Sequence, residues 1–505
     1  MTIASEIQDL QTNLQAAKSA VTNKGGTVGD TGLAGLATEI AGIPGGGGSI
    51  DWTDSQAVYE ATRPSDWIDM PEEVNDNEMY WLLHIPTSET GNILIGTSPM
   101  NFAAGTTTVT VEFGTTSNKI FVPDPNLTVV LTANQARNGL KISIPATSFS
   151  NPTSDSKKQI LMKLSADGDI TTWSSSGSNN SSIKTLAVEL SGKTHFTMLS
   201  NTFQNCNNLR YISLIITSSP TSFSASYAFS DCKKLICLPV FETSRTLTSI
   251  NYMFNNCYSL VVAPELSVSG NANASSMFYN CFGLKYVPSF DSSAIKTFSN
   301  TFYFCYSLME APNLNTSSGT NFTSMFSNCA SLTKVPNLDT SKGTNLSYMF
   351  SNCQALQSVP SLDTSAATDM TLMFASCISL RESDFTDYDF THISSTQRMN
   401  QFLGTSSSVN VVTLGNKFGA NGICSTGVFM STNSNDNYPA AHVKITKTDE
   451  VLKINSNGTY AFQGSNLYVY VPDSLLASYQ ADTNWASLDT AGRLKTLSDF
   501  PYIPS

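Results

Sequence analysis

Charged side chains are scarce in this chain. Asp, Glu, Lys and Arg make up 13% of its 505 residues, about half of the usual share in a globular protein, and Ser, Thr and Asn are abundant instead. The 27 basic residues are outnumbered by 39 acidic ones, so the net charge is −12. A surface that binds nucleic acid needs a basic stripe, and one that binds anionic lipid needs basic clusters. The charge balance therefore argues against both kinds of partner.

Export and membrane signals are also missing from the sequence. Residues 1–10 have neither the basic start nor the long apolar run of a secretory signal peptide. No apolar run approaches the ~18 residues that a membrane-spanning helix needs. We therefore expect a chain that is made in the cytoplasm, without a signal peptide and without a transmembrane segment.

Catalytic and metal-binding patterns are absent as well. The four histidines are far apart in the sequence, and none is paired with a Cys or Asp at the spacing of a metal or nucleophile site. Cys232 and Cys237 have no second pair near them, which is unlike a zinc site. Neither a phosphate-binding loop nor a dinucleotide fingerprint occurs. The sequence thus predicts no enzyme and no cofactor.

What the sequence does contain is a repeat between residues 203 and 380. The phrase Phe-x-x-Cys-x-x-Leu occurs eight times, with Cys-to-Cys steps of 26, 25, 24, 24, 24, 24 and 24 residues. A fixed period in this range is the signature of a solenoid, in which equivalent residues of stacked coils form internal ladders. The predicted core ladder comprises Phe254, Cys257, Leu260, Phe278, Cys281, Leu284, Phe302, Cys305, Leu308, Phe326, Cys329, Leu332, Phe350, Cys353, Leu356, Phe374, Cys377 and Leu380.

Eight of the ten cysteines lie at this repeat position. In-register residues on neighbouring coils have Cβ atoms about 4.8 Å apart, whereas a disulfide needs a Cβ separation of about 3.8 Å and a turned geometry. We therefore predict reduced, buried thiols that fill space as small apolar side chains. Such thiols indicate folding in a reducing compartment.

One repeat shows the elements that we expect in each coil. Residues 322–329 place apolar side chains at i, i+3, i+4 and i+7, which predicts about two helical turns. Residues 331–335 alternate and predict a very short strand. Acidic turn residues follow and recur from coil to coil as a ridge. Two interpretations of this ridge are open: Asx-type turns, or weak Ca²⁺ or glycan binding at Asp291, Asp339 and Asp363.

Residues 1–43 predict a helical, coiled-coil-like anchor. Apolar residues at steps of 4, 3, 4, 3 and 4 form a strict a/d heptad pattern, and fewer than three heptads are too short for a stable isolated helix. An oligomerisation or docking helix and an amphipathic helix packed on its own domain are both open. The heptad positions are Ile3, Ile7, Leu10, Leu14, Ala17 and Val21. The Gly-rich residues 44–51 predict a flexible linker.

Residues 52–192 predict an antiparallel β-sandwich. Short alternating segments separated by Gly, Pro, Asn and Ser are typical of this fold, and the Asp167-Gly168 pair predicts a tight hairpin turn. Trp81 and Trp173 are expected in the core, with exposed aromatics for glycan stacking as the alternative. The eight expected strands are 80–85, 92–95, 108–113, 119–122, 127–131, 140–144, 159–164 and 185–190.

Residues 193–403 are expected to form the solenoid, and residues 404–505 to form irregular repeats with a C-terminal cap. Longer stacked strands are expected at 409–414, 442–445 and 467–471. A helix is expected at 474–480, with Asp473 as its N-cap. Such a cap covers the exposed edge of the last coil and blocks pairing with other chains.

The repeat motif resembles the BspA-like subclass of leucine-rich repeats. Its form here is Met-Phe-x-x-Cys-x-x-Leu-x-x-x-Pro-x-Leu-x-Thr-Ser, which is cleanest in residues 325–341 and 349–365. The resemblance implies a multidomain, β-rich protein with a leucine-rich-repeat-type right-handed solenoid. It also implies a binding scaffold without fixed chemistry.

The segment 3–43 is similar to the N-terminal segment of many phage tail and virion proteins. The similarity comprises the heptad helix, a Gly-Thr-Val turn at 26–28 and a Leu-Ala-x-Leu-x-x-x-Ile helix at 33–40. The sequence Arg-Pro-Ser-Asp-Trp at 63–67 also looks like a phage virion module. In those proteins the N-terminal segment holds the fibre to the virion, which implies other virion proteins as partners.

These features favour a bacteriophage virion structural protein of the tail or head fibre type, whose repeat rod binds the host cell surface. We expect a homo-oligomer, with a trimer favoured, and a glycan or protein receptor. A bacterial surface adhesin and a glycan-degrading tail enzyme are the alternatives. Exposed tyrosines of the repeats suit adaptable binding. The candidate recognition surface comprises Tyr252, Tyr279, Tyr303, Tyr306 and Tyr348.

Overall fold

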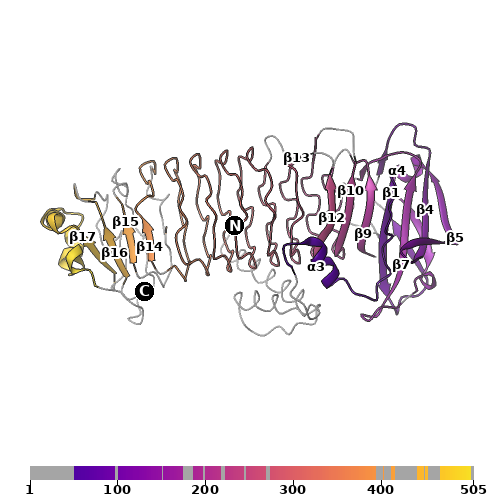
Figure 1. Cartoon of the computed structure of the whole chain (residues 1–505), viewed down its shortest axis with the longest axis horizontal. Coiled ribbons are helices and arrows are strands. Elements are labelled where there is room, and N and C mark those ends of the chain that lie inside the picture. The colour runs from indigo at the N-terminus through magenta and orange to yellow at the C-terminus, as the bar shows by residue number, and fades with distance from the viewer. Residues whose placement is uncertain are drawn as a thin grey trace. The chain divides into compact units, whose positions relative to one another are not determined.

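The structure is a computed structural model of the chain (Figure 1). It describes residues 51–96, 100–150, 152–173, 186–196, 199–217, 222–243, 246–268, 273–380, 382–393, 402, 411–415, 441–447, 450–452 and 467–501. The chain forms two compact units. The N-terminal unit comprises Met1–Asn273 and Met277–Asp291, and the C-terminal unit comprises Ala274–Ser276 and Ser292–Ser505. None of the described helices is long and apolar enough to cross a membrane.

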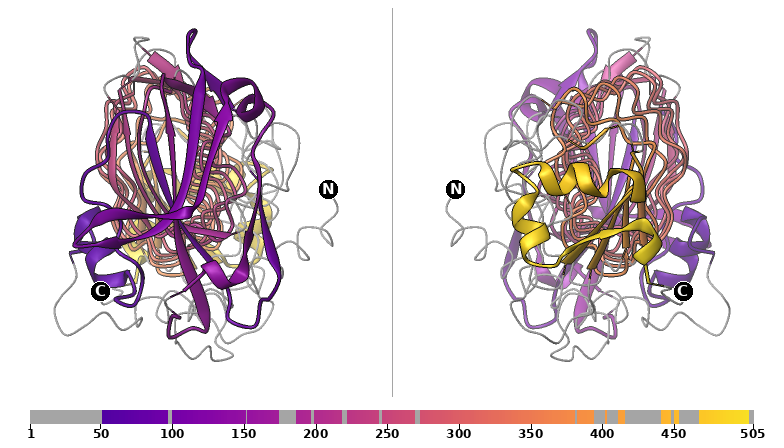
Figure 2. Two further views of the ribbon diagram at one scale, coloured as in Figure 1. Left: turned by 90° about the vertical axis from the view of Figure 1, so that its right-hand side faces the viewer. Right: turned by 90° about the vertical axis from the view of Figure 1, so that its left-hand side faces the viewer.

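A seven-stranded sheet is the framework of the N-terminal unit, with the order β12-β10-β9-β1-β7-β4-β5 (Figures 1 and 2). Its strands are β1 (Glu78–Pro86), β4 (Thr108–Ser117), β5 (Ile120–Thr132), β7 (Lys157–Ala166), β9 (Ala187–Thr194), β10 (Tyr211–Ile216) and β12 (Cys237–Thr243). β1 pairs antiparallel with β7 and β9, whereas β10 pairs parallel with β9 and β12. All residues of β1 except the last are buried, so both faces of the sheet are covered at its centre.

Two short ribbons complete the region that was expected as a sandwich. β2 (Asn92–Gly96) pairs with β6 (Lys141–Pro145), and β3 (Met100–Phe102) pairs with β8 (Ile170–Trp173). On one face of these ribbons the apolar side chains are buried, as the period-two alternation of a half-buried strand requires: Ile95, Met100, Phe102, Ile142, Ile144 and Ile170. Leu94, on the other face of β2, is 59% exposed. The β-rich module is thus confirmed, with ribbons in place of a second full sheet.

Each of the eight expected segments overlaps an observed strand. Residues 119–122 and 127–131 were expected as two strands, but they belong to the single edge strand β5. A bulge in β5 places residues 124–127 opposite the single residue Phe113 of β4, and the pairing of β4 with β5 resumes beyond it. The intervening prolines are tolerated because an edge strand and a bulge do not need every N–H donor. The helix α4 (Ala133–Arg137) follows β5.

The hairpin predicted at Asp167-Gly168 is wrong, because β8 pairs with β3 and not with β7. The Asp167 carboxylate accepts hydrogen bonds from the backbone N–H groups of Thr107 and Thr108, each 3.0 Å long. These bonds tie the turn to the start of β4. The chain therefore leaves the main sheet at this point instead of folding back along β7.

The expected boundary at residue 192 lies inside a strand. β9 crosses it and pairs with β1 on one side and with β10, a strand of the first repeats, on the other. The parallel strands β10 and β12 thus extend the antiparallel sheet. Two further short strands, β11 (Ser222–Ser224) and β13 (Thr246–Ser249), pair with each other in parallel. One sheet therefore joins the strands of the sandwich region to the first coils.

The backbone of the coils differs from the helical turns that were predicted. In residues 322–329 alternate N–H groups donate to the next coil, as from Phe326 N to Met349 O at 2.9 Å, and those between donate to the carbonyl three residues back. Ser324 and Asn328 have left-handed φ angles of 54° and 63°, which an α-helix of L-residues does not contain. The helix prediction is wrong because half of these amides pair with the neighbouring coil.

The strand predicted in each coil is reduced to single bridges in the C-terminal unit. Lys334, within the expected strand 331–335, forms one parallel bridge with Glu310. A second row of bridges joins Thr297, Asn321, Asn345 and Asp369. Together with the backbone hydrogen bonds between coils, these bridges form the solenoid that the period predicts, and the β-rich solenoid is confirmed.

The C-terminal unit also contains a five-stranded parallel sheet. In order, its strands are β14 (Glu382–Phe385), β15 (Val411–Leu414), β16 (Ala441–Ile445), β17 (Leu467–Val471) and β18 (Leu494–Thr496). The three longer strands expected from the sequence are confirmed as β15, β16 and β17. The helices α7 (Leu476–Ala481) and α8 (Ala486–Thr490), yellow in Figure 2, lie beside this sheet.

Asp473 does not cap the last helices as predicted. Residues Asp473–Leu475 form a 3-10 turn, and α7 begins at Leu476 without a side-chain cap. The Asp473 carboxylate instead accepts hydrogen bonds from the backbone N–H and the hydroxyl of Ser498. The carboxylate thus ties the turn to the segment after β18, which offers it two donors.

Two buried aromatic side chains hold this end of the C-terminal unit together. The Tyr479 hydroxyl accepts a hydrogen bond from Leu452 N at 2.9 Å, and the Trp485 indole N–H donates to Leu452 O at 3.0 Å. Both rings are fully buried. The backbone of Leu452 is thereby satisfied without a strand partner, as a buried peptide group requires.

Candidate functional site

The predicted core ladder lies in the interior of the two units. Each of its Phe, Cys and Leu side chains is at most 1% exposed. Rings of successive coils stack face to face, with centroids 5.5 Å apart for Phe254 and Phe278 and 5.3 Å apart for Phe302 and Phe326. Stacked rings add to the free energy gained by burial. These residues therefore hold the fold and offer no surface to a ligand.

The ladder cysteines are free thiols that also donate hydrogen bonds. All nine cysteines in the described part of the chain are free and buried. The Cys329 thiol donates to Phe302 O and the Cys353 thiol to Phe326 O, each at 3.1 Å. Burial raises the pKa of these thiols, and that of Cys377 to about 12. The reactive thiolate is therefore scarce at neutral pH.

Thiol labelling tests this arrangement. In the native protein at pH 8 we expect the ladder cysteines to react at least about a hundredfold more slowly than in denaturant, because the reagent attacks the thiolate and needs access to it. Denatured, unreduced protein should show nearly all ten cysteines as free thiols. Fast labelling of several native cysteines, or intact disulfides after denaturation, would contradict the ladder geometry.

The acidic ridge of the repeats is built of Asx turns. In the C-terminal unit Asp339 Oδ1 accepts hydrogen bonds from the hydroxyl and the N–H of Ser341, and these bonds lower the pKa of Asp339. Asp363 Oδ1 accepts a hydrogen bond from Ser365 N in the same way. Asp291 belongs to the other unit. Among the described residues, no group of three or more His, Cys, Asp or Glu could hold a metal ion.

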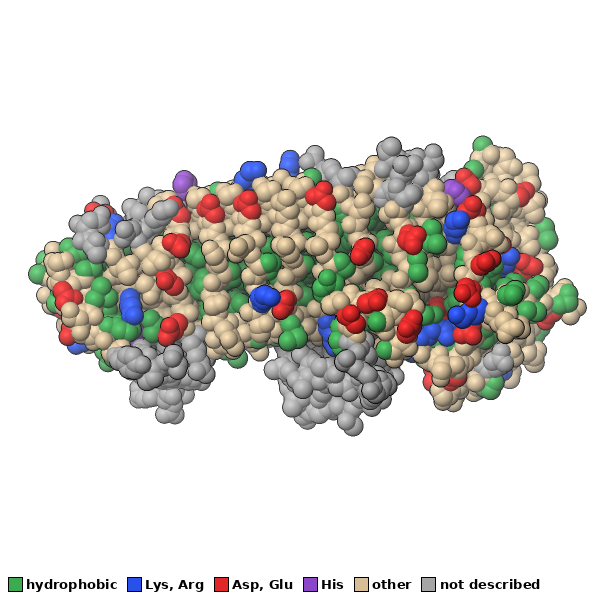
Figure 3. Space-filling view, viewed as in Figure 1, with side chains coloured by type: hydrophobic (Ala, Val, Ile, Leu, Met, Phe, Trp, Pro, Cys, Tyr) green, Lys and Arg blue, Asp and Glu red, His purple; other side chains and the backbone are tan. Residues whose placement is uncertain are grey.

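The five candidate tyrosines are not equivalent. Tyr306 is only 3% exposed, and its ring packs against Phe304 with centroids 5.4 Å apart, so its assignment to the recognition surface is wrong. The remaining four, Tyr252, Tyr279, Tyr303 and Tyr348, are half-buried or exposed. Tyr348 is the most accessible of them at 41%. Figure 3 shows uncharged polar side chains and backbone predominating on one face of the protein.

A buried ion pair fixes the helix α3 (Ser55–Thr62) on the main sheet. Arg63 Nε donates to Glu189 Oε2 at 2.9 Å, and the Tyr59 hydroxyl donates to Glu189 Oε1 at 2.7 Å. Glu189 is 3% exposed. Burial raises the pKa of Glu189, while the charge of Arg63 and the two hydrogen bonds act in the opposite direction. The first residue of the Arg-Pro-Ser-Asp-Trp sequence therefore attaches this segment to β9.

The last residue of the same sequence, Trp67, packs against His84. Their ring centroids are 4.9 Å apart in an edge-on arrangement. His84 is 8% exposed, and its Nε2 has no hydrogen-bond partner among the described residues. Burial lowers the pKa of His84 to about 4. The imidazole is therefore neutral in the folded protein at a pH at which an exposed histidine binds a proton.

Acid should destabilise the N-terminal unit through His84. Between pH 6.5 and about 4 the unfolded chain binds a proton here that the folded chain does not, so stability falls as the pH falls through this window. The expected loss is on the order of 2–3 kcal/mol. Urea denaturation at a series of pH values measures it, and His84→Gln should remove this part of the pH dependence. An unchanged slope in that variant would show that another group is responsible.

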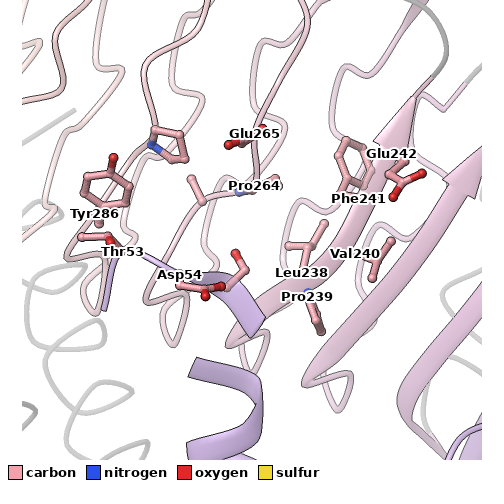
Figure 4. Close-up of a pocket in the computed structure, with 13 residues that line it drawn as sticks. Thr53, Asp54, Leu238, Pro239, Val240, Phe241, Glu242, Pro264, Glu265 and Tyr286 are labelled. Carbon is pink, nitrogen blue, oxygen red and sulfur yellow. The ribbon is translucent and has the colours of Figure 1, made fainter. Parts of the chain in front are cut away.

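A groove lies beside α3 in the N-terminal unit (Figure 4). Its volume of about 410 Å³ is in the range of small-ligand sites. The lining residues are Thr53, Asp54, Ser55, Leu238, Pro239, Val240, Phe241, Glu242, Ala263, Pro264, Glu265, Tyr286 and Pro288. Tyr286 is 37% exposed. Glu242 and Glu265 are exposed and have no hydrogen-bond or ion-pair partner in the described part of the chain.

The walls of this groove are held by their own contacts. The Lys285 ammonium lies 3.6 Å from the centroid of the Trp52 ring, which joins the residues before α3 to a coil. The Asp54 carboxylate accepts a hydrogen bond from Gln56 N at 2.8 Å and caps α3. Because these contacts do not involve Glu242 or Glu265, both carboxylates are left for a ligand.

Sequence reasoning missed this groove. Tyr286 lies two residues after the ladder residue Leu284, where later repeats have Glu310 and Lys334. A repeat position that is occupied by an aromatic side chain in one coil and by charged side chains in others is exposed to solvent. This variation could have identified the site from the sequence. Nothing in the sequence indicated that residues 53–55 would lie beside it.

Two parts of the predicted site lie outside the described residues. One is the heptad set of Ile3, Ile7, Leu10, Leu14, Ala17 and Val21, so the docking helix remains a prediction. The other is the side chain of Trp173. The side chain of Trp81, its expected companion in the core, is 2% exposed.

A family model matches the repeat region. Residues 272–388 and residues 296–412 each match the family described as "Mycoplasma protein of unknown function, DUF285". The two matches are displaced by 296 − 272 = 24 residues, which is one repeat. They cover less than a third of the chain, and they agree with the BspA-like resemblance of the repeats.

Whole-chain comparisons with curated proteins and solved structures give no relative that indicates a function. No curated protein matches this chain. A solved structure titled "Crystal structure of TLR13-ssRNA13 complex" is 15% identical over 56% of this chain and 39% of that chain, with a TM-score of 0.24. The match thus spans well under half of that protein, and a likeness this weak carries no argument about function. The comparisons show that residues 272–412 are similar to a repeat family of unknown function.

Proposed function

We propose that this chain is a binding protein without catalytic activity, which attaches to a neutral glycan or a protein on a cell surface. The groove beside α3 is the observation that carries the proposal. It presents the exposed ring of Tyr286 together with the unpartnered carboxylates of Glu242 and Glu265. An aromatic ring supports the apolar face of a sugar or a peptide side chain, and carboxylates accept hydrogen bonds from hydroxyl or amide groups.

The charge of the groove limits the class of ligand. Asp54, Glu242 and Glu265 all line it, and the chain as a whole has a net charge of −12. Like charges brought together without a counter-charge are unfavourable. Phosphate-rich and sulfated polymers are therefore poor candidates, and uncharged glycans or protein segments fit better.

The buried ionisable groups support a structural rather than a catalytic role. Glu189 is paired with Arg63 and Tyr59, and the ladder thiols donate to carbonyl oxygens of neighbouring coils. A catalytic group needs a proton or a lone pair available to a substrate. A glycan-degrading enzyme is the alternative, because glycoside hydrolysis uses two carboxylates and the groove contains those of Glu242 and Glu265.

For the setting we propose a phage virion, in which the chain is a trimeric tail or head fibre protein. The support is the resemblance of residues 3–43 to N-terminal segments of virion proteins, together with the heptad pattern. A bacterial surface adhesin is the alternative, and the repeat family of the coils is compatible with both settings.

Attachment should be measured with the full-length chain, because a fragment that begins at Lys193 would cut β9. Binding to bacterial cells and to immobilised neutral glycans is compared for Tyr286→Ala and the double variant Glu242→Gln/Glu265→Gln. We expect each to bind at least about tenfold more weakly, as for a central binding residue. Ile378→Ala, an exposed apolar residue of the other unit outside the candidate recognition surface, is the control. Full binding by both groove variants would reject the groove, and release of sugar or peptide products would favour the enzyme.

The virion setting is tested separately by removing residues 1–48. Light scattering should give three times the 54.4 kDa chain mass for the full chain and one chain mass for the truncated one. An antibody to the chain should label virions in electron micrographs. A monomeric full-length chain, or the absence of label on virions, would remove the support for the fibre proposal.

A further inference from the structure

Three side chains form a row across the middle of the main sheet, away from the groove residues. Lys163 on β7 is the register partner of Tyr80 on β1 and of Glu112 on β4. Side chains of register partners point to the same face of a sheet. Tyr80, Lys163 and Glu112 are therefore neighbours on one face, in strands that the sequence separates by up to 83 residues.

A cavity of about 580 Å³ lies over this row. Its walls come from the segment before β1 and from the hairpin between β4 and β5. The lining residues are Pro71, Glu72, Glu73, Asn75, Tyr80, Glu112, Asn118, Lys119, Ile120, Phe121, Pro123 and Lys163. Phe121 contacts Tyr80 with ring centroids 5.6 Å apart. The cavity thus has an aromatic corner and a polar floor, the composition of a small-molecule site.

The hydrogen-bonding groups of the floor are only partly used by the protein. Lys163 Nζ lies 2.7 Å from Glu78 Oε1 and 3.8 Å from Glu112 Oε2. An ammonium has three N–H donors, and only the first of these distances is a hydrogen bond. Glu112, whose side chain is 23% exposed, has no closer partner among the described residues. Lys163 therefore has donors, and Glu112 acceptors, available to a ligand.

Glu78, by contrast, is fully engaged. Its Oε2 accepts hydrogen bonds from the Tyr80 hydroxyl at 3.0 Å and from the backbone and side-chain nitrogens of Asn75 at 3.2 and 3.1 Å. The Glu78 carboxylate neutralises the Lys163 charge across their 2.7 Å contact. The ammonium is thereby left as an oriented hydrogen-bond donor rather than as an unbalanced cation.

The wall that carries Phe121 is fixed by backbone geometry. Asn118 and Lys119 form the turn of the hairpin with left-handed φ angles of 50° and 59°. Lys119 O accepts a hydrogen bond from Glu72 N at 3.1 Å, which joins the two walls. Beside the bulge of β5, a Cβ on Gly114 of β4 would collide with the Val122 carbonyl oxygen. The hairpin can approach β4 this closely only because residue 114 is glycine.

We propose that this cavity binds a single neutral sugar ring. Two neighbouring hydroxyls of a pyranose would bridge the floor, one accepting a hydrogen bond from Lys163 and the other donating to Glu112. The apolar face of the ring would lie against Phe121. Three carboxylates, of Glu72, Glu73 and Glu112, outnumber the ammonium groups of Lys119 and Lys163 in the lining, so the cavity favours an uncharged ligand over an anion. The inference goes beyond the attachment groove, because the two sites share no lining residue.

The proposal is tested with the methyl glycosides of glucose, galactose, mannose and N-acetylglucosamine, using ligand-detected nuclear magnetic resonance and calorimetry on the full-length chain. We expect at least one glycoside to bind. Glu112→Ala and Phe121→Ala should each weaken that binding at least tenfold. Glu89→Ala, an exposed carboxylate outside the cavity, and Tyr286→Ala, in the groove, should leave it unchanged. Thermal unfolding of each variant reports whether the fold is intact. If Glu112→Ala does not fold, Glu112→Gln takes its place.

Three results would overturn the proposal. One is that no glycoside binds at millimolar concentration. The second is that glycoside binding is unchanged in both Glu112→Ala and Phe121→Ala. The third is that n-butylammonium binds in place of the glycosides and is lost in Glu112→Ala, which would identify a cation site. A wrong assignment of the attachment groove would be seen in a different assay. Tyr286→Ala would then retain cell binding, whether or not the glycosides bind to the cavity.

Discussion

Replacing Phe326 with alanine should lower the free energy of unfolding by roughly 3–5 kcal/mol. The ring is fully buried and stacks between Phe302 and Phe350, at centroid distances of 5.3 and 5.7 Å. Removing it leaves a cavity that its stacked neighbours cannot fill without shifting along the ladder, and close-packed interiors resist such shifts. Chemical denaturation of the purified full-length chain, followed by circular dichroism, measures the change.

Tyr348→Ala is the matched control for this measurement. It removes a ring of similar size in the following coil of the same unit, but at a position that is 41% exposed. The control should lose less than about 1 kcal/mol, as most surface substitutions do. A loss of that size for Phe326→Ala as well would show that Phe326 is not an interior ladder residue.

Replacing Arg63 with methionine should be about as costly, at roughly 3–5 kcal/mol. The methionine keeps much of the apolar stem but leaves Glu189, which is 3% exposed, as a buried carboxylate without its counter-charge. Only the Tyr59 hydroxyl, 2.7 Å away, would still satisfy it. The loss should appear in the N-terminal unit, as faster proteolysis within α3 and a lower denaturation midpoint.

The double variant Arg63→Met/Glu189→Gln separates the charge from the packing. Glutamine keeps the shape of Glu189 and can still accept the Tyr59 hydrogen bond, but it carries no charge. We expect it to recover most of the stability lost in Arg63→Met, because the cost lies in the uncompensated charge. No recovery would mean that the contacts of the Arg63 stem matter more than the ion pair.

The ladder could be read from the sequence because burial repeats with the chain. Each coil meets the same neighbours above and below, so Phe326, Cys329 and Leu332 recur at one spacing. The backbone conformation could not be read in this way. Apolar positions at i, i+3, i+4 and i+7 fit a helix, yet the same spacing is produced by turns with left-handed residues such as Ser324 and Asn328. Side-chain periodicity reports which residues face inward and not where their amides donate.

The candidate sites were beyond sequence reasoning for a different reason. The cavity floor joins Tyr80, Glu112 and Lys163 through a strand order that is not the chain order. The groove joins residues 53–55 to residues between 238 and 288 of the coils. Local patterns placed most of the strands, but the sequence carried no signal for which strands lie beside each other. Tyr306 failed for a local reason, because its ring packs against Phe304, whereas Ile378 at the same repeat position is 44% exposed.

The sharing of amides between coils has a mechanical consequence. In the C-terminal unit Ser324, Phe326 and Asn328 donate to Ser347, Met349 and Ser351 of the next coil, so these bonds run from coil to coil. Tension on an end of the chain would load only the bonds of the outermost coil and break them before the next coil is strained. Each 24-residue coil released in this way would lengthen the chain by up to about 80 Å. Such a stack would lengthen in steps under load and absorb work at each one.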